Sequence, residues 1–263
     1  MVMEKKYTYE ELVEIIRTLR SENGCPWDRE QTHGSLKNCM IEEAYEVCEG
    51  IDQLEKQKDP TNLCEELGDV LLQVIMHSVI GEEAKEFTME DVIHGISEKM
   101  IRRHPHVFGD TKVKDSHQVL QNWEEIKKEE KKEVTVSEGM IRVPKAFPSV
   151  MRAEKVQKKA AKVGFDFPSY EAALQKVYEE LEELENARKY ESFQRVQEEF
   201  GDFMFSVVNL SRFLQLNAEN SLTNATDKFI NRFVNVERLA NSEGRALSEM
   251  SIDELDALWG RIK

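Results

Sequence analysis

Apolar residues recur every three or four positions along most of the chain, with Glu, Lys and Gln between them. This spacing is typical of amphipathic α-helices. Glycine and proline, which interrupt helices, occur only 12 and 6 times in 263 residues. Capping boxes that begin at Thr8, Thr88 and Ser251 mark three helix starts. The pattern predicts an all-α chain, with helices over residues 8–20, 36–57, 61–84, 89–103, 116–132, 149–162, 169–189, 192–216, 221–240 and 251–262.

The expected helices form two sets of five, separated by a stretch that contains Gly139, Pro144 and Pro148. Two acidic motifs occur in the same order in both sets. Glu-Glu-x-x-Glu begins at Glu42 and again at Glu179, and a Glu-x-x-Asp motif follows on the next helix of each set. Repeated motifs in the same order indicate a duplicated module. The sequence therefore predicts an N-terminal domain over residues 1–133, a linker over 134–148 and a C-terminal domain over 149–263.

Composition narrows the possible functions. The chain has 36 Lys and Arg against 51 Asp and Glu, a formal charge of -15 that disfavours binding to a nucleic acid polymer. No apolar run is long enough to span a membrane, and the first residues show no leader pattern. The four cysteines form no Cys-x-x-Cys pair, and we expect them to be free, buried thiols. These features predict a cytoplasmic protein.

Each half carries two acidic pairs on neighbouring helices, and the members of a pair share a helix face because they are three residues apart. Four carboxylates brought together repel one another unless a divalent cation neutralises them. Ligands that are all oxygen favour a hard cation such as Mg²⁺. The expected metal ligands are Glu180, Glu183, Glu199 and Asp202, with Glu43, Glu46, Glu66 and Asp69 as their counterparts.

A solvated acidic face is the alternative for any one pair in so acidic a chain. Two observations favour a site. The second pair of each half opens the most apolar helix of that half, and the whole arrangement occurs twice. Gly68 and Gly201, inside those pairs, weaken a helix by about 1 kcal/mol relative to Ala. They suggest that another helix or a ligand approaches closely.

Basic and aromatic residues follow the acids in both halves. A Lys and an Arg four residues apart share a helix face and could bind phosphate groups. These pairs are Lys99 with Arg103 and Lys228 with Arg232. Trp123 and Trp259 lie near the end of each half and could stack on a nucleobase, although a core position is the alternative. His104-Pro105-His106 is interpreted as a turn or a phosphate contact rather than as a metal-ligand pair.

These features together resemble the tandem form of the MazG family of nucleoside triphosphate pyrophosphohydrolases. The resemblance rests on the duplicated acidic motifs, the run 102–108, the segments 24–28 and 164–166, and Trp259. It implies two helical modules of the four-helix-bundle type, dependence on Mg²⁺ and assembly as a homodimer. The implied reaction hydrolyses NTPs and dNTPs between the α and β phosphates, in house-cleaning of nucleotide pools. The implied nucleotide contacts are Lys176, Glu179, Lys228, Arg232 and Trp259, with Lys99, Arg103 and Trp123 as counterparts.

Several points stay open at this level. Glu179 or Glu42 could accept the proton of the attacking water. Either half, or both, could be active. The alternative function is a non-catalytic nucleotide-sensing or dimerisation module in which one or both halves are scaffolds. A di-iron carboxylate bundle is disfavoured because its sites use Glu-x-x-His motifs, whereas the i+3 positions of these acidic pairs are Glu46, Asp69, Glu183 and Asp202.

Overall fold

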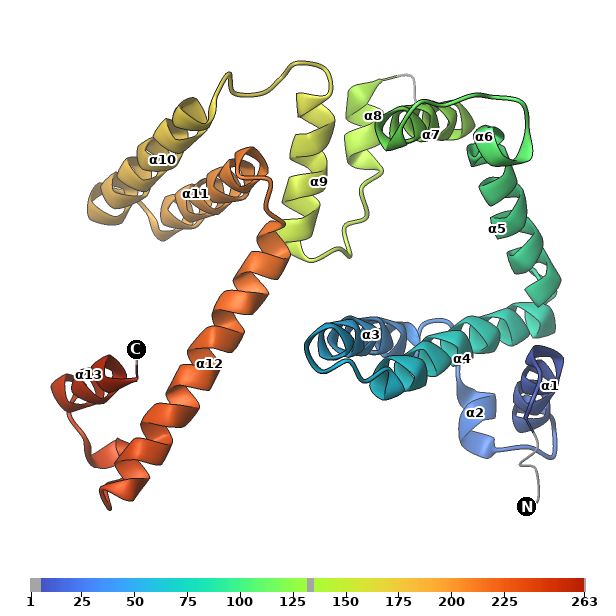
Figure 1. Cartoon of the computed structure of the whole chain (residues 1–263), viewed down its shortest axis with the longest axis horizontal. Helices are drawn as coiled ribbons and strands as arrows, with labels where there is room; N and C mark the ends of the chain where they lie inside the picture. The colour runs from blue at the N-terminus through green and yellow to red at the C-terminus, as the bar shows by residue number, and fades with distance from the viewer. Residues whose placement is uncertain (1–5, 132–134, 263) are drawn as a thin grey trace. The chain divides into compact units, whose positions relative to one another are not determined.

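The computed structural model describes residues 6–131 and 135–262, and over these residues it confirms the all-α prediction, because it contains helices and no strand (Figure 1). The predicted boundary between residues 133 and 134 lies outside this range. The chain divides into two compact units, residues 1–127 and 128–263. In the described residues, no helix is both long enough and apolar enough to cross a membrane.

Every predicted helix is present, with ends that differ by a few residues. The helices of the first half are α1 (Tyr9–Arg20), α2 (Pro26–Glu30), α3 (Lys37–Gln57), α4 (Thr61–Ala84), α5 (Met89–Arg103), α6 (Pro105–Phe108) and α7 (Ser116–Lys131). The second half has α8 (Val136–Ile141), α9 (Ser149–Ala161), α10 (Tyr170–Tyr190), α11 (Phe193–Phe213), α12 (Ala218–Ser242), the 3₁₀ helix η1 (Leu247–Glu249) and α13 (Ile252–Arg261). The predicted capping boxes at Thr8, Thr88 and Ser251 all form.

Short helices are the elements that periodicity did not predict. Helices α2 and α6 have only 5 and 4 residues, too few to show a repeating apolar face. Each begins with a proline, whose fixed φ suits the first helical position. Helix α8 lies inside the predicted linker, where Thr135 and Glu138 form a capping box. Part of that segment is therefore helical.

In the first unit, the core joins α1, the start of α3 and the middle of α4. Its buried side chains are Val13, Ile16, Leu36, Ile75, Met76 and Val79. Helices α3 and α4 form a hairpin and touch at Gly50, where a Cβ atom would lie only 2.9 Å from the Cα of Leu63. The four cysteines are free as predicted, but the prediction that they are buried is wrong, because Cys25 and Cys39 are only partly buried and Cys48 and Cys64 are exposed. Those two lie on the solvent-facing side of this hairpin.

In the second unit, α10 and α11 form the corresponding hairpin. Helix α9 packs against α11, and the Gln157 side chain donates a hydrogen bond of 2.8 Å to the carbonyl of Phe205. Helix α13 packs on α12 around Val236, Ala240 and Leu258. Each unit thus contains a hairpin of two long helices, and these hairpins carry the predicted acidic residues.

Candidate metal centre

Three of the four acids predicted in the second half converge between α10 and α11. One carboxylate oxygen from each of Glu180, Glu199 and Asp202 lies within 4.8 Å of the others. Glu180 and Glu199 are only 6% exposed, whereas Asp202 faces solvent. The fourth predicted ligand, Glu183, is exposed and lies outside this group.

The rotation of each helix explains this selection. The buried positions of α10 are Ala173, Glu180 and Ala187, which are seven residues apart and form one stripe toward its neighbour. Glu183 is three residues past Glu180 and so projects away from the centre of that stripe. On α11, Glu199 shares its buried stripe with Ser206, again seven residues on. Small neighbours on both helices leave room for the two buried carboxylates.

Two cations lie against the buried acids. The Lys176 ammonium is 2.7 Å from Glu180 and 2.6 Å from Glu179. The hydrogen bonds that Lys176 donates to Glu179 and then to Glu180 raise the pKa of Lys176. Lys176 therefore stays charged, and in the metal-free chain it partly neutralises Glu180.

Arg195 plays the same part on α11. Its guanidinium contacts Glu199, and also lies 3.2 Å from Glu191 and 2.5 Å from Glu198. The hydrogen bonds that Arg195 donates to Glu198 and Glu191, together with the charge of Glu199, raise the pKa of Arg195. Sequence reasoning missed this residue. Its position four residues before Glu199, on the same helix face, was the available signal.

One carboxylate oxygen of this group is left without a partner. The Oε2 atom of Glu180 is buried and has no hydrogen-bond partner among the described residues. Burying such an oxygen unpaired is unfavourable by about 1–3 kcal/mol or more. A hard cation bound by carboxylate oxygens would satisfy it. The donor set and the unpaired oxygen both fit Mg²⁺.

The first half also brings three acids together, between α3 and α4, but it includes Glu46, whose counterpart Glu183 lies outside the second group. Carboxylate oxygens of Glu43, Glu46 and Glu66 lie within 4.8 Å of one another. Asp69 lies outside this set of three but is close enough for its charge to act on Glu43. Burial, followed by the charges of Asp69 and Glu66, raises the pKa of Glu43. Burial is also the main cause that raises the pKa of Glu66, to which Asn62 donates a hydrogen bond of 2.8 Å.

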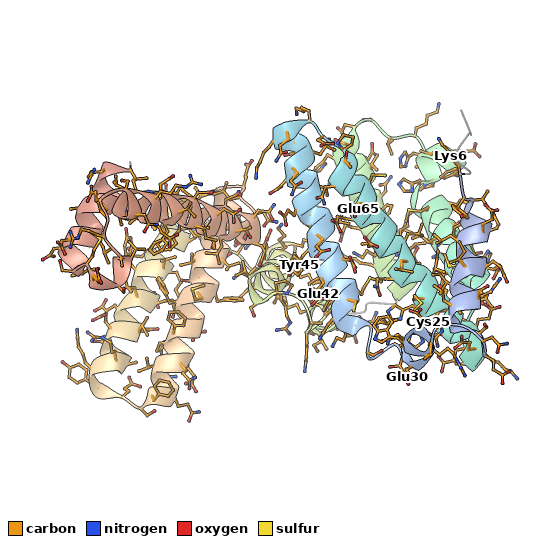
Figure 2. The ribbon with its side chains drawn as sticks, turned by 90° about the horizontal axis from the view of Figure 1, so that it is seen from below. Lys6, Cys25, Glu30, Glu42, Tyr45 and Glu65 are labelled. Carbon is orange, nitrogen blue, oxygen red and sulfur yellow. The ribbon has the colours of Figure 1, made fainter. Side chains whose placement is uncertain are left out.

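The candidate bases lie at the edge of each group. Glu42 is exposed on α3, and Figure 2 shows it with Tyr45 on that helix and Glu65 on α4. Glu179 is exposed on α10 and accepts a hydrogen bond from Lys176. Both carboxylates precede a residue of the converged group in sequence, and both are open to solvent.

The two conspicuous glycines do not mark a contact within the chain. Apart from the adjacent residues and the nearby backbone of the same helix, no atom of the described residues lies within 4 Å of a Cβ built on Gly68 or Gly201. The expected close approach of another helix at these positions is therefore wrong for the single chain. The tight contact of the first hairpin is at Gly50, seven residues after Glu43 and on the same stripe of α3.

Each half pairs its predicted arginine with its predicted tryptophan. The guanidinium carbon lies 5.2 Å from the ring centre for Arg103 and Trp123, and 4.1 Å for Arg232 and Trp259. Both distances suit a cation–π contact. Lys99 and Lys228 lie one turn earlier on the same helices, half-buried and exposed respectively.

In the second unit this pair lies apart from the acids. Helix α13 runs beside the far part of α12, away from the α10–α11 hairpin (Figure 1). The single chain therefore does not bring Arg232 and Trp259 to the group of Glu180.

The histidines contribute one feature that sequence reasoning missed and one that it anticipated. His33 and His77 stack with ring centres 5.0 Å apart and their Nδ1 atoms 2.7 Å apart. His104, expected in a turn, caps α5 and meets the Trp123 ring edge-on at 4.9 Å. Neither pair belongs to a carboxylate group.

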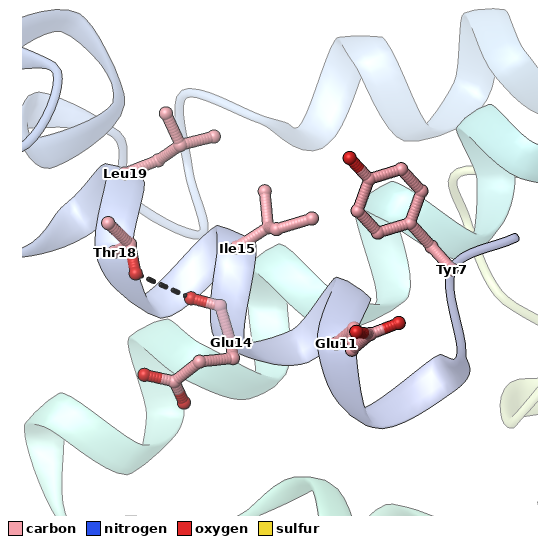
Figure 3. A pocket seen from close by; sticks show the side chains of 6 residues that line it. All are labelled: Tyr7, Glu11, Glu14, Ile15, Thr18 and Leu19. Carbon is pink, nitrogen blue, oxygen red and sulfur yellow. Dashed lines mark hydrogen bonds between the residues drawn. The ribbon is translucent and has the colours of Figure 1, made fainter. Parts of the chain in front are cut away.

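A shallow hollow on the surface of α1 is separate from both acid groups (Figure 3). It contains none of the predicted site residues. It is lined by Tyr7, Glu11, Glu14, Ile15, Thr18 and Leu19.

Comparisons with known proteins agree with this two-fold arrangement. The model of the MazG nucleotide pyrophosphohydrolase domain matches twice, over residues 31–108 and 168–236. The nucleoside triphosphate pyrophosphohydrolase/pyrophosphatase MazG of Thermotoga maritima is 45% identical over 97% of this chain and 95% of its own. The Escherichia coli K12 nucleoside triphosphate pyrophosphohydrolase is 38% identical over 96% and 95%. The YabN protein of Bacillus subtilis is 48% identical over the whole chain, which corresponds to 53% of YabN.

Proposed function

Because this chain belongs to the MazG nucleotide pyrophosphohydrolase family, we propose that it hydrolyses NTPs and dNTPs to nucleoside monophosphates and pyrophosphate in a Mg²⁺-dependent reaction. The observation that carries the proposal is the buried, unpartnered Oε2 of Glu180 within a group of three carboxylates. Such a group suits a hard cation that also binds phosphate oxygens.

The roles of the residues follow from their chemistry. Glu180, Glu199 and Asp202 would hold the metal ion in the second half, as would Glu43, Glu46 and Glu66 in the first. When bound, Mg²⁺ would polarise the phosphate and make a water more acidic. Glu179 or Glu42 would accept the proton from that water.

Cationic groups would bind the triphosphate. Lys176, Lys228 and Arg232 can each donate hydrogen bonds to phosphate oxygens and so stabilise the charge that develops on the leaving pyrophosphate. Trp259 would contact the base. Lys99, Arg103 and Trp123 are the corresponding candidates in the first half.

We further propose that the chain acts in the cytoplasm as a homodimer. Exposed aromatic side chains support the dimer: Phe200 and Phe205 on α11 and Phe229 on α12 are 55%, 46% and 56% exposed. A second copy covering them would bury apolar surface. Sedimentation at two protein concentrations tests this point, and a monomer at all concentrations would refute it.

A product assay tests the reaction. The chain is incubated with a panel of NTPs and dNTPs, with Mg²⁺ or with EDTA, and pyrophosphate is resolved from orthophosphate. We expect pyrophosphate to be released from the nucleotides with Mg²⁺ and not with EDTA. Orthophosphate released from the γ position would refute the assigned bond.

Variants locate the active half. Glu180→Gln and Glu43→Gln are made separately, and the half whose variant loses turnover is the active one. Glu185→Gln is the matched control, because Glu185 is an exposed acid of α10 paired with Arg188 and Lys189 outside the group. If neither variant reduces turnover, the carboxylate proposal fails.

A further inference from the structure

The two hairpins carry matching acidic motifs but differ in the residues one helical turn before Glu43 and Glu66 and before Glu180 and Glu199. In the second half, Lys176 precedes Glu180 by four residues and Arg195 precedes Glu199 by four. The corresponding positions of the first half hold Cys39, before Glu43, and Asn62, before Glu66. Neither side chain carries a positive charge. The second group therefore carries two built-in cations that these positions of the first group lack.

Each of these cations contacts a buried acid and an exposed acid at once. Lys176 bridges Glu180, whose side chain is 8% exposed, and Glu179, which is 52% exposed. The cation can therefore leave the buried carboxylate and still keep a partner on the surface.

Arg195 repeats the arrangement with two surface partners. It bridges Glu199, 8% exposed, and the exposed carboxylates of Glu191 and Glu198. Glu191 and Glu198 are solvated by water, whereas Glu199 is not. An arginine released from Glu199 would lose one charge contact and retain two.

We propose that Lys176 and Arg195 are exchangeable counter-cations of the second acid group. Before the metal binds, they neutralise Glu180 and Glu199. When a divalent cation enters, Lys176 shifts onto Glu179, and Arg195 shifts onto Glu191 and Glu198. This exchange rests on the proposed function only because both require the same carboxylates to bind the metal.

Electrostatics supports this exchange. Two largely buried carboxylates without a cation would repel each other strongly, and the cations remove that repulsion in the metal-free chain. The unpaired Oε2 of Glu180 indicates that the neutralisation is incomplete and leaves a position for a metal ion. The consequence is that the metal must compete with Arg195, so the second group binds a free ion more weakly than its acids alone would.

Binding of Mn²⁺ to the full chain without nucleotide tests the exchange. Glu43→Gln serves as the background that weakens the first group, and bound ion is measured by electron paramagnetic resonance. We expect Arg195→Gln to tighten Mn²⁺ binding about fivefold, because it removes the competitor. We expect the double variant Glu191→Gln/Glu198→Gln to weaken binding, because Arg195 then depends more on Glu199.

The matched control is Arg188→Gln. Arg188 pairs with the exposed Glu185 at 3.2 Å and not with the acid group, so its variant should leave the affinity unchanged. Circular dichroism confirms that each variant is folded. Weaker or unchanged binding in Arg195→Gln would overturn the proposal, as would an absence of Mn²⁺ binding in every variant.

The same set separates this inference from the proposed reaction. If Arg195→Gln tightens Mn²⁺ binding but the chain releases no pyrophosphate from any nucleotide, the exchange stands and the reaction fails. If pyrophosphate is released while Arg195→Gln leaves Mn²⁺ binding unchanged, the reaction stands and the exchange fails.

Discussion

Replacing Glu43 by Gln should stabilise the metal-free chain, because the first acid group has no cation where the second has Lys176 and Arg195. Gln has nearly the same shape as Glu but no charge. Burial and the neighbouring charges of Asp69, Glu66 and Glu42 raise the pKa of Glu43. The folded chain therefore carries repulsion at this position that the unfolded chain does not.

The magnitude follows from the spacing of the group. Two unit charges about 5 Å apart repel by about 1 kcal/mol in water and by more in a partly buried site. The carboxylates of Glu46 and Glu66 both lie within 4.8 Å of that of Glu43. Glu43→Gln in EDTA is therefore expected to raise the free energy of unfolding by about 1–2 kcal/mol at about pH 8.

The pH dependence has a definite sign. Below the ordinary pKa of 4.5 the carboxyl group is neutral in both the folded and the unfolded chain, and the substitution changes little. As pH rises above that value, the unfolded chain ionises first, so the wild-type chain loses stability that the variant keeps. The gain should therefore grow from about pH 4 to about pH 8.

Urea unfolding followed by circular dichroism measures this gain at both pH values. Glu49→Gln is the control, because Glu49 is exposed on the same helix and contacts Gln53 instead of the acid group. Saturating Mg²⁺ should stabilise the wild type more than Glu43→Gln and so reduce or reverse the gain. A gain that is absent, or equal at both pH values, would refute the reasoning.

Two further predictions concern the first unit. Gly50→Ala should lower the free energy of unfolding by about 1–3 kcal/mol, because its Cβ would meet the backbone of Leu63 at 2.9 Å. Gly68→Ala, where a Cβ would meet open space, should raise the free energy of unfolding by about 0.5–1 kcal/mol. Urea unfolding measures both changes, and changes of the same sign in the two variants would contradict this prediction. Burial and then the charge of His33 lower the pKa of His77, so the unit should lose stability as pH falls below about 6.5, where the unfolded chain binds protons first. His77→Gln should reduce that loss in thermal melting between about pH 8 and pH 5, and an unchanged acid profile would count against it.

Local signals made most of the fold predictable. The long helices carry repeated apolar spacing, and capping boxes such as those at Thr8 and Ser251 depend on residues three apart. The short helices α2 and α6 were not predicted, because they have too few residues to show a full apolar repeat. The end of α11 also differed from the prediction, in which the apolar pattern continued the helix to residue 216. The helix ends at Phe213, and Gln215 has a φ of 56°, which is not helical.

The acid groups were predictable only in part. Spacing of three residues places Glu180 and Glu183 on neighbouring parts of one helix face, but it does not say which of them points at α11. That depends on how α10 is rotated about its axis, which is set by packing of Ala173 and Ala187 against the neighbouring helix. The rotation is a tertiary property, so only the structure shows that Glu183 lies outside the converged group.

The same dependence applies to the residues that neutralise the acids. The differences between Cys39 and Lys176, and between Asn62 and Arg195, are visible when the two halves are aligned. The consequence of these differences is not visible in the alignment, because a residue four positions before a ligand neutralises a buried ligand only if that face of the helix is turned inward. Once Glu180 and Glu199 are known to be buried, a nearby cation changes from an ordinary surface charge into a competitor for the metal. Matching acidic motifs in the two halves therefore do not imply equal affinity for a divalent ion.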